Sequence, residues 1–359
     1  MRQLRVTSYE LRVKNAKRLI LFLSLLVTCY LSLVISVFAD EIESKAALVM
    51  EASTGRVLFA KNPNLKLPPA STAKLVTAMV VLDNTQLGNM VTISNNAAKV
   101  SSLRETRLKA GETMTVQALL DAALIRSANN AAYALAEAVS GSEKEFVKLM
   151  NRKAVAIGAN NTKFINTTGL PGQGQQITAY DLAKILRYSL KYPVLKEIIG
   201  TKTMEIATEE GRTITLENTN KLLWSDNGAV GGKTGYTRAA RHCFVYAEEK
   251  NNETVIVALL GAPKRNLLWE EAERLATRGF DVMANNEPPL IYFTKADYKN
   301  GLQSKVSSKD REKKITRVSS KKRSKKAKTG KPDVKTTSSG NSEMKDTGMA
   351  WRNSNGSKG

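Results

Sequence analysis

A serine and a lysine three residues apart, Ser71 and Lys74, are the pair in this sequence whose types and spacing could perform covalent chemistry. Pro68 and Pro69 precede them, and proline favours a helix start because it lacks the N–H group that a first turn leaves unpaired. We therefore expect a helix to begin near Ser71, with both side chains on one face of its first turn. Backbone N–H groups at that end favour developing negative charge. The pair is a candidate serine nucleophile with a lysine base.

The Ser-x-x-Lys spacing is a weak signal when it stands alone. It recurs at Ser319 and Lys322 and again at Ser342 and Lys345, in a basic stretch where no active site is expected. A serine is also an ordinary helix cap, and a lysine is ordinarily a solvated surface residue. The spacing becomes informative only together with other functional groups.

The small number of histidines and cysteines limits which kinds of active site and metal site the chain can form. The chain contains one histidine, His242, and two cysteines, Cys29 and Cys243. A zinc site of His and Cys lacks ligands, and His242 is the only imidazole that could activate a serine. Two cysteines give no disulfide framework, and Cys243, in a predicted strand, is typical of a small core residue. If Ser71 attacks a substrate, a lysine is the expected base.

Two further polar motifs accompany the pair. Ser127 and Asn129 interrupt two segments of helical periodicity, which predicts a hydroxyl and an amide in a short loop. Lys233 and Thr234 point to opposite faces of a predicted strand, and Gly235 lets a ligand lie close to its backbone. Both motifs recur elsewhere in the chain, so only the ordered set of three on suitable elements is informative.

Apolar periodicity predicts an α+β fold. Runs at 46–50 and 57–60 indicate a β-hairpin, and three more antiparallel strands are expected at 231–237, 242–248 and 255–260. Helical spacing indicates helices at 71–82, 115–125, 131–139, 143–157, 179–189 and 268–283. Strands at both ends of a domain with helices between them predict one antiparallel sheet covered by helices, plus a helical lobe.

The net charge of +22 is concentrated at the two ends of the chain. Within 1–39, six Lys/Arg precede an uncharged apolar run, which indicates an export signal and a location in the periplasm, at the outer face of the cytoplasmic membrane or in the cell wall. The run ends at Ala39 in a small-residue cleavage pattern but is long enough to span a bilayer, so a cleaved signal peptide and a retained signal anchor both stay open. We predict a catalytic domain at 40–285, followed by a linker and tail at 286–359.

The tail is rich in Lys, Ser, Thr and Gly from about residue 301 and cannot bury enough apolar surface to fold. We expect a disordered basic segment. Its partner would be an anionic wall polymer or a membrane surface, although a charge run is also commonly just solvated. Nucleic acid is disfavoured as a partner because the protein is expected to be exported.

The ordered motifs resemble those of the active-site serine penicillin-recognising enzymes. Within that group the sequence is similar to the low-molecular-mass D-alanyl-D-alanine carboxypeptidases over about 44–285. The similar blocks are 67–75, 124–132, 178–183, 218–223 and 232–237. The resemblance implies the penicillin-binding protein/β-lactamase-like transpeptidase fold.

The resemblance also implies an activity, which is removal of the terminal D-alanine from peptidoglycan pentapeptide stems. Ser71 would attack the D-Ala-D-Ala carbonyl and form an acyl-enzyme, and water would then release the shortened stem. Lys74 would be the base, with its pKa depressed by burial and by the charge of Lys233. Ser127 would relay a proton to the leaving amine. A β-lactam would mimic the substrate and acylate the same serine.

Substrate binding follows from the resemblance as well. Asn129 would hold the substrate backbone and orient the catalytic lysine. Lys233 and Thr234 would bind the terminal carboxylate, beside the close backbone approach that Gly235 permits. The backbone N–H groups of the nucleophile and of Tyr236 would form the oxyanion hole. No metal or cofactor is implied.

One departure and three alternatives accompany this assignment. The family commonly has Ala-Gly where this chain has Ala240-Arg241, which leaves the local turn and the cleft rim open. A D,D-endopeptidase that cuts peptidoglycan cross-links would use the same residues. A β-lactamase that deacylates through a glutamate needs a Glu-x-x-Leu-Asn block, which this sequence lacks. A non-catalytic wall-binding scaffold is the alternative of another class, although every expected catalytic position is filled.

Overall fold

The computed structural model describes residues 42–102 and 106–294. These lie in the first of the two units into which the chain divides, Met1–Gly301 and Leu302–Gly359. The predicted export segment and the predicted basic tail lie outside the described residues, so both stay predictions. Across the described ranges, no helix is both long and apolar enough to cross a membrane.

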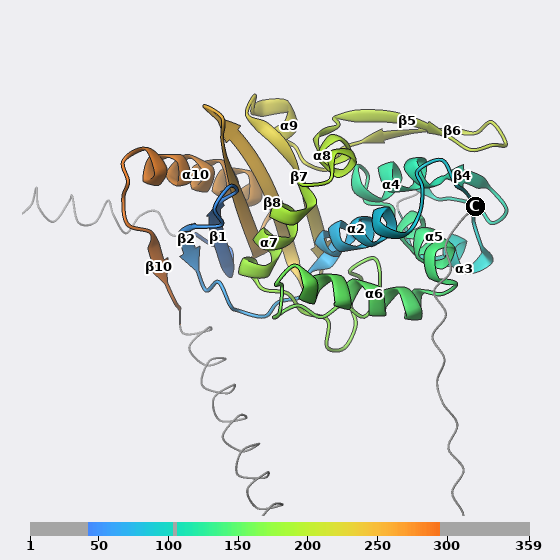
Figure 1. Ribbon diagram of the computed structural model, residues 1–359, viewed down its shortest axis with the longest axis horizontal. Coiled ribbons are helices and arrows are strands. Elements are labelled where there is room, and N and C mark those ends of the chain that lie inside the picture. The colour runs from blue at the N-terminus through green and yellow to red at the C-terminus, as the bar shows by residue number, and fades with distance from the viewer. Residues whose placement is uncertain (1–41, 103–105, 295–359) are drawn as a thin grey trace, which may run out of the picture. The chain divides into compact units, whose positions relative to one another are not determined.

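A six-stranded sheet forms the centre of the described part (Figure 1). The strand order is β10-β2-β1-β9-β8-β7, and every neighbouring pair is antiparallel except β10 and β2. The strands are β1 (Ala46–Glu51), β2 (Val57–Lys61), β7 (Ala229–Thr237), β8 (Arg241–Lys250), β9 (Glu253–Ala262) and β10 (Leu290–Tyr292). The predicted hairpin and the predicted three antiparallel strands are confirmed. They form one sheet because β1 pairs with β9.

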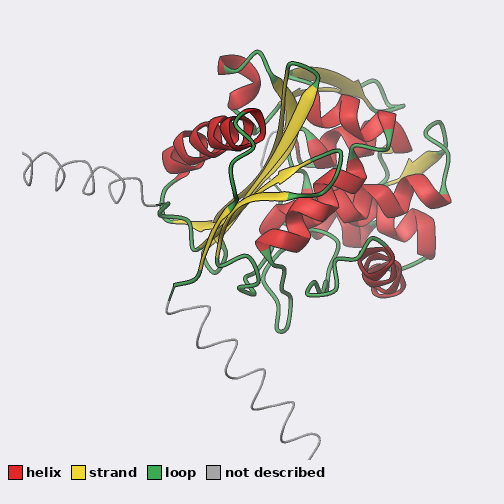
Figure 2. Cartoon of the chain, turned by 60° about the vertical axis from the view of Figure 1, so that its left-hand side comes forward, coloured by secondary structure: helices red, strands yellow, loops and turns green. Residues whose placement is uncertain are grey.

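Both faces of the central strands are buried, and alternate side chains enter two different cores. In β9, Ile256 and Ala258 pack into the core shared with most of the helices. Val255 and Val257 pack into a second core, together with side chains of helix α10 (Arg265–Ala284). Figure 2 shows the sheet between these two layers of helices. A strand buried on both faces has a continuous apolar sequence, which explains the unbroken run at 255–260.

The helical lobe is built around α2 (Lys74–Asn84), which contacts four other helices and is buried from Lys74 to Val81. Those helices are α4 (Val116–Leu124), α5 (Asn129–Ser140), α6 (Glu143–Ala156) and α7 (Ala179–Ser189). The side chains of Thr115, Ser142 and Thr178 cap α4, α6 and α7 by accepting a backbone N–H of the first turn. The predicted helices are confirmed to within a few residues, and so is the predicted α+β class.

Two local expectations need correction. Ser71 lies in the 3-10 turn η1 (Ala70–Ala73), and the α-helix itself begins at Lys74. Asn129 is the first residue of α5, so only the preceding turn, with Ser127 at a φ of 66°, interrupts the helices. In both places a tight backbone turn contains a serine of the predicted site, Ser71 in the first and Ser127 in the second.

Several short elements were not predicted, because they are too short for a periodic pattern to be recognised. They are β3 (Met90–Thr92), α3 (Asn95–Lys99), β4 (Thr113–Thr115), α8 (Pro193–Gly200), β5 (Thr203–Ala207), β6 (Thr213–Glu217) and α9 (Leu222–Ser225). Strand β10 lies beyond the predicted boundary at residue 285. The backbone N–H of Thr294 also donates to Asn62 Oδ1 at 2.6 Å, so the folded unit extends to the end of the described residues.

Candidate active site

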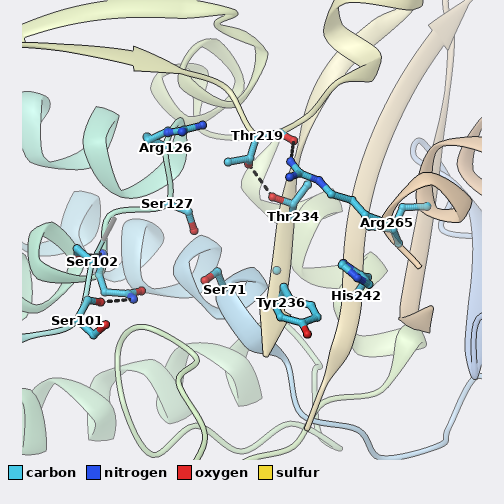
Figure 3. A pocket seen from close by; sticks show the side chains of 13 residues that line it. Ser71, Ser101, Ser102, Arg126, Ser127, Thr219, Thr234, Tyr236, His242 and Arg265 are labelled. Atoms are coloured by element: carbon cyan, nitrogen blue, oxygen red, sulfur yellow. Dashed lines mark hydrogen bonds between the residues drawn. The ribbon is translucent and has the colours of Figure 1, made fainter. Parts of the chain in front are cut away.

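An open cleft of about 410 Å³ lies between η1, the helical lobe and the outer part of β7 (Figure 3). Six of the eight predicted site residues line it, namely Ser71, Ser127, Asn129, Thr234, Gly235 and Tyr236. Lys74 and Lys233 are fully buried beside them. Three segments far apart in the sequence therefore meet at one place.

The predicted nucleophile and base are in direct contact. Lys74 Nζ lies 3.0 Å from Ser71 Oγ, as their three-residue separation on one helical turn allows. The same Nζ donates to Asn129 Oδ1 at 2.6 Å and to the carbonyl of Thr168 at 3.1 Å. Burial holds the pKa of Lys74 well below its usual value, and the nearby charge of Lys233 lowers it further. The site therefore favours an amine that can accept a proton.

Thr168 was not anticipated as part of the site. It belongs to a loop rich in turn-forming residues at 166–172, where Asn166 Oδ1 accepts the N–H of Gly169 at 2.8 Å. This loop packs directly on η1, because a side chain on Gly169 would collide with the carbonyl of Ala70. The loop contributes a main-chain oxygen to the lysine, and such a contact has no side-chain signature in a sequence.

Asn129 is held at both ends of its amide. Its oxygen accepts from the buried lysine, and its Nδ2 donates to the carbonyl of Ser101 at 2.6 Å. Helix α5 has no side-chain cap from Ala128, and the hydroxyl of Ser102 instead accepts the N–H groups of Asn129 and Asn130 at 3.0 Å. Residues 101 and 102 therefore fix the amide that orients the lysine, and both also line the cleft.

Ser127 combines two unfavourable features. Its φ of 66° is a left-handed conformation, which is strained for a residue with a side chain. Its hydroxyl is buried and has no hydrogen-bond partner among the described residues. Leaving such a group unpaired costs about 1–3 kcal/mol. Figure 3 shows this hydroxyl facing Ser71, where a substrate atom could be its partner.

Strand β7 approaches the nucleophile closely. A Cβ on Gly235 would lie 2.7 Å from the backbone nitrogen of Ser71, so only glycine fits here. Next to it, Thr234 Oγ1 donates to Thr219 Oγ1 at 2.6 Å. Tyr236 is 55% exposed, and its ring lies against that of His242 at a tilt of 34°, with the ring centroids 4.5 Å apart. The strand thus supplies one wall of the cleft.

The positively charged side chains that line the cleft differ from the one expected from the sequence. Lys233 does not line the cleft: it is buried, and its Nζ donates to the carbonyl of Thr234 at 3.1 Å. Burial lowers the pKa of Lys233 to about 7. The cations that line the cleft are Arg126 and Arg265, at the start of α10. Sequence reasoning missed both, and Arg265 comes from an element predicted only as a covering helix.

The chain keeps a tight turn at Arg241, where its sequence departs from the family pattern at the rim of the cleft. Arg241 has a φ of 60°, the left-handed region that a glycine adopts freely, and its Nη2 donates to the carbonyl of Pro263 at 3.0 Å. The neighbouring His242 lines the cleft, and burial, Arg265 and Arg241 lower its pKa. Cys243 is fully buried, which raises the pKa of its thiol to about 12, as expected for a core residue.

Two comparisons of sequence point to one family. The D-alanyl-D-alanine carboxypeptidase family matches residues 34–264. The D-alanyl-D-alanine carboxypeptidase DacF of Bacillus subtilis is 38% identical over 225 residues, which cover 61% of this chain and 58% of that protein. The match thus spans less than two thirds of that relative. A D-alanyl-D-alanine endopeptidase of Escherichia coli is 35% identical over 241 residues, covering 66% of this chain and 77% of the relative.

Solved structures agree in fold. A penicillin-binding protein homologue from Mycobacterium tuberculosis superposes with a TM-score of 0.64 at 31% identity, covering 68% of this chain and 93% of that one. The Streptomyces K15 DD-transpeptidase gives a TM-score of 0.63 at 30% identity, covering 67% and 98%. The expected penicillin-binding protein-like fold is confirmed. The chain belongs to the D-alanyl-D-alanine carboxypeptidase family.

Proposed function

We propose that the protein is an exported serine D-alanyl-D-alanine carboxypeptidase that removes the terminal D-alanine from peptidoglycan pentapeptide stems. The observation that supports this most directly is the 3.0 Å contact between Ser71 Oγ and the buried amine of Lys74. Ser71 attacks the carbonyl of the D-Ala-D-Ala bond and forms an ester with the stem, D-alanine leaves, and water hydrolyses the ester.

Lys74 acts as the general base. A neutral amine has two N–H groups and one lone pair. Asn129 Oδ1 and the carbonyl of Thr168 accept the two N–H groups, so the lone pair is left to face the hydroxyl of Ser71. A lysine in water is protonated at neutral pH, and the lowered pKa of Lys74 makes this neutral form accessible.

Ser127 delivers a proton to the departing amine of D-alanine. This role is supported by its buried, unpartnered hydroxyl on the far side of the cleft from β7. The backbone N–H groups of Ser71 and Tyr236 form the oxyanion hole, which accounts for the close approach of Gly235 to η1. One such donor contributes roughly 3 kcal/mol to transition-state stabilisation.

The terminal carboxylate of the stem binds beside β7. Thr234 and Thr219 present hydroxyl groups there, and the guanidinium of Arg265 lies 3.5 Å from the carbonyl of Thr219. Lys233 is buried behind this wall and acts through its charge on Lys74. β-Lactams, as mimics of the D-Ala-D-Ala bond, acylate the same serine.

Export rests on the 1–39 segment, and the enzyme acts outside the cytoplasmic membrane, in the periplasm or at the cell wall. The basic tail from about residue 301 is assigned to an anionic wall polymer or a membrane surface. Neither assignment depends on the geometry of the cleft.

The second candidate activity is that of a D,D-endopeptidase. It is favoured by the Escherichia coli relative, which is named an endopeptidase and matches over a larger share of its length than DacF does. A non-catalytic scaffold is a weaker candidate, because a scaffold gains nothing from a strained serine and a buried lysine at the cleft.

One experiment separates these candidates. Release of D-alanine from a soluble pentapeptide and cleavage of a cross-linked muropeptide dimer are measured for the full chain and for Ser71→Ala. A carboxypeptidase releases D-alanine, and Ser71→Ala does not. Cleavage of the dimer alone would identify the endopeptidase, and no product from either substrate would leave the scaffold.

A further inference from the structure

A row of cations lies on α7 and just after it, away from the cleft. Lys184, Arg187 and Lys191 follow one another at spacings of three and four residues, so they share one face of the helix. Like charges at these spacings repel each other. The arrangement therefore costs stability unless an anion compensates for it.

The three cations line a small cavity of about 110 Å³, together with Ile157 and Tyr188. Among the residues that the structure describes, no acidic side chain lines it. This volume is several times what one water molecule requires, so the cavity admits a small anion such as phosphate.

Two larger cavities neighbour the small one. A second cavity of about 440 Å³ shares Arg187 and Lys191 with the first and adds Lys196. A third, of about 480 Å³, shares Lys196 and Val230 with the second and follows α8. The three neighbouring cavities, which share these residues along α7 and α8, are called the groove below; both helices are labelled in Figure 1.

The cations of the groove are held in position, but not by carboxylates. The Nε and Nη2 groups of Arg187 donate to the carbonyls of Ala52 and Ser53, both at 2.5 Å. Lys184 donates to the carbonyl of Gly158 at 2.8 Å, and Lys191 lies 5.1 Å from the ring centroid of Tyr188. None of the ion pairs between described residues involves a cation of the groove.

The acidic groups around the groove compensate its positive charge only in part. Glu51 lines the second cavity but is ion-paired with Arg56 at 3.2 Å. Glu253 lines the second cavity and Glu197 the third, and neither lines the smallest. Asp181, on the same helix as Lys184, is buried, accepts from the N–H of Asn161, and interacts with the charge of Lys184. Arg187 and Lys191 therefore carry most of the uncompensated charge of the smallest cavity.

We propose that this groove binds an anionic phosphodiester polymer, with one phosphate in the small cavity and the chain along α8. A polymer fits better than a lipid surface, because none of the exposed large apolar side chains among the described residues lines the groove. Arg and Lys are the side chains that recognise phosphate. The groove would position the enzyme on the wall.

This binding leaves the cleft open. Val230 lines the groove and Thr234 lines the cleft, and both belong to β7. At about 3.3 Å per residue, roughly 13 Å of strand separates them. The proposal is independent of the proposed catalytic activity, because no residue of the groove lines the cleft.

The test is hydrogen exchange on the full chain with short-chain polyglycerol phosphate as the probe. This readout is local, so binding by the basic tail does not obscure it. We expect slower exchange in peptides covering 50–56 and 184–196. Lys184→Gln with Lys191→Gln should lose this protection and need roughly tenfold more polymer for half-saturation, as the loss of two surface ionic contacts implies.

The matched control is Lys144→Gln with Lys202→Gln, which removes the same charge from exposed lysines that line none of these cavities. The control pair should keep the protection, and both double variants should keep D-alanine release. Without polymer, the Lys184/Lys191 variant should melt no lower than the wild type, because it removes like-charge repulsion. Inorganic phosphate should protect the same peptides only at higher concentration.

Three outcomes would overturn the proposal. They are an absence of protection at 50–56 and 184–196, protection that survives in the Lys184/Lys191 variant, and equal loss in the control pair. Phosphatidylglycerol vesicles are tested in parallel. Stronger protection by vesicles than by the polymer would assign the groove to lipid headgroups and refute the polymer.

Discussion

Gly235→Ala is the substitution that tests most directly how β7 and η1 together form the active site. The new Cβ would lie 2.7 Å from the backbone nitrogen of Ser71 and 2.9 Å from the Cβ of Ala70. The first of these is a backbone atom, which no side-chain rotation can move away. Either the strand or the 3-10 turn must therefore shift.

The size of the shift follows from the contact. Ordinary van der Waals contacts of a Cβ begin at 3.4 Å, so β7 and η1 must separate by roughly 0.7 Å. Overpacking of this kind costs about 1–3 kcal/mol of folding free energy. A displacement approaching 1 Å costs about 100-fold in rate, and loss of one oxyanion donor costs about 100- to 1,000-fold. We expect acylation of Ser71 to slow by roughly 100-fold in Gly235→Ala.

The assay must separate a misplaced site from an unfolded protein. The acylation rate with a fluorescent penicillin and the release of D-alanine from a pentapeptide are measured below the melting transition, at a folded fraction verified by circular dichroism. Gly88→Ala is the matched control, because a Cβ on Gly88 has nothing within 4 Å. It should acylate at the wild-type rate.

The reasoning fails if folded Gly235→Ala acylates within about threefold of the wild-type rate. In that case the oxyanion hole would tolerate a displacement of η1 from β7, and the close packing of Gly235 would have no role in catalysis. A loss of rate fully explained by a smaller folded fraction would have the same meaning.

Three other substitutions probe the charges. Burial raises the pKa of Glu248 to about 7, so the folded state keeps a proton that the unfolded chain releases near pH 4.5. The stability associated with this proton is lost as the pH rises through 7. Urea unfolding should therefore show Glu248→Gln about 1 kcal/mol more stable than wild type at pH 8 and equal to it at pH 5. His242 is the only histidine, so NMR should show one imidazole titrating below pH 6.5 and at a higher pH in Arg265→Gln, and no shift would contradict the assigned cause. In Lys233→Met the pKa of Lys74 should rise, moving the acid limb of the pH profile of kcat/KM to higher pH, and an unmoved limb would exclude this coupling.

The parts of the fold that were predictable are those whose burial is regular. The run at 255–260 is apolar on both faces of β9, and α2 is apolar nearly all round because helices and the sheet surround it. The short elements between α7 and β7 were missed. Each buries only a few side chains, as in β5, where Ile206 is the single buried residue, so no period becomes visible in the sequence.

The ordered motifs predicted which residues meet, because their chemistry restricts them to a few types. They did not predict that Thr234, Gly235 and Tyr236 would line the cleft while Lys233 is buried. That difference depends on the packing of η1 against Gly235, which only the tertiary structure establishes. Arg265 was missed for a similar reason, since only the tertiary arrangement brings the start of α10 to this wall.

The unfavourable features of the molecule are concentrated at these same motifs. A strained serine with an unpartnered hydroxyl and two buried lysines with lowered pKa values lie around one cleft. The local preferences of these residues would predict neither the strained backbone nor the buried polar groups, because each of them destabilises the folded chain. They persist because the two cores on either side of the sheet hold η1 and β7 in contact. A substrate that hydrogen-bonds to Ser127 would relieve part of this cost, which is the property expected of a site complementary to a transition state.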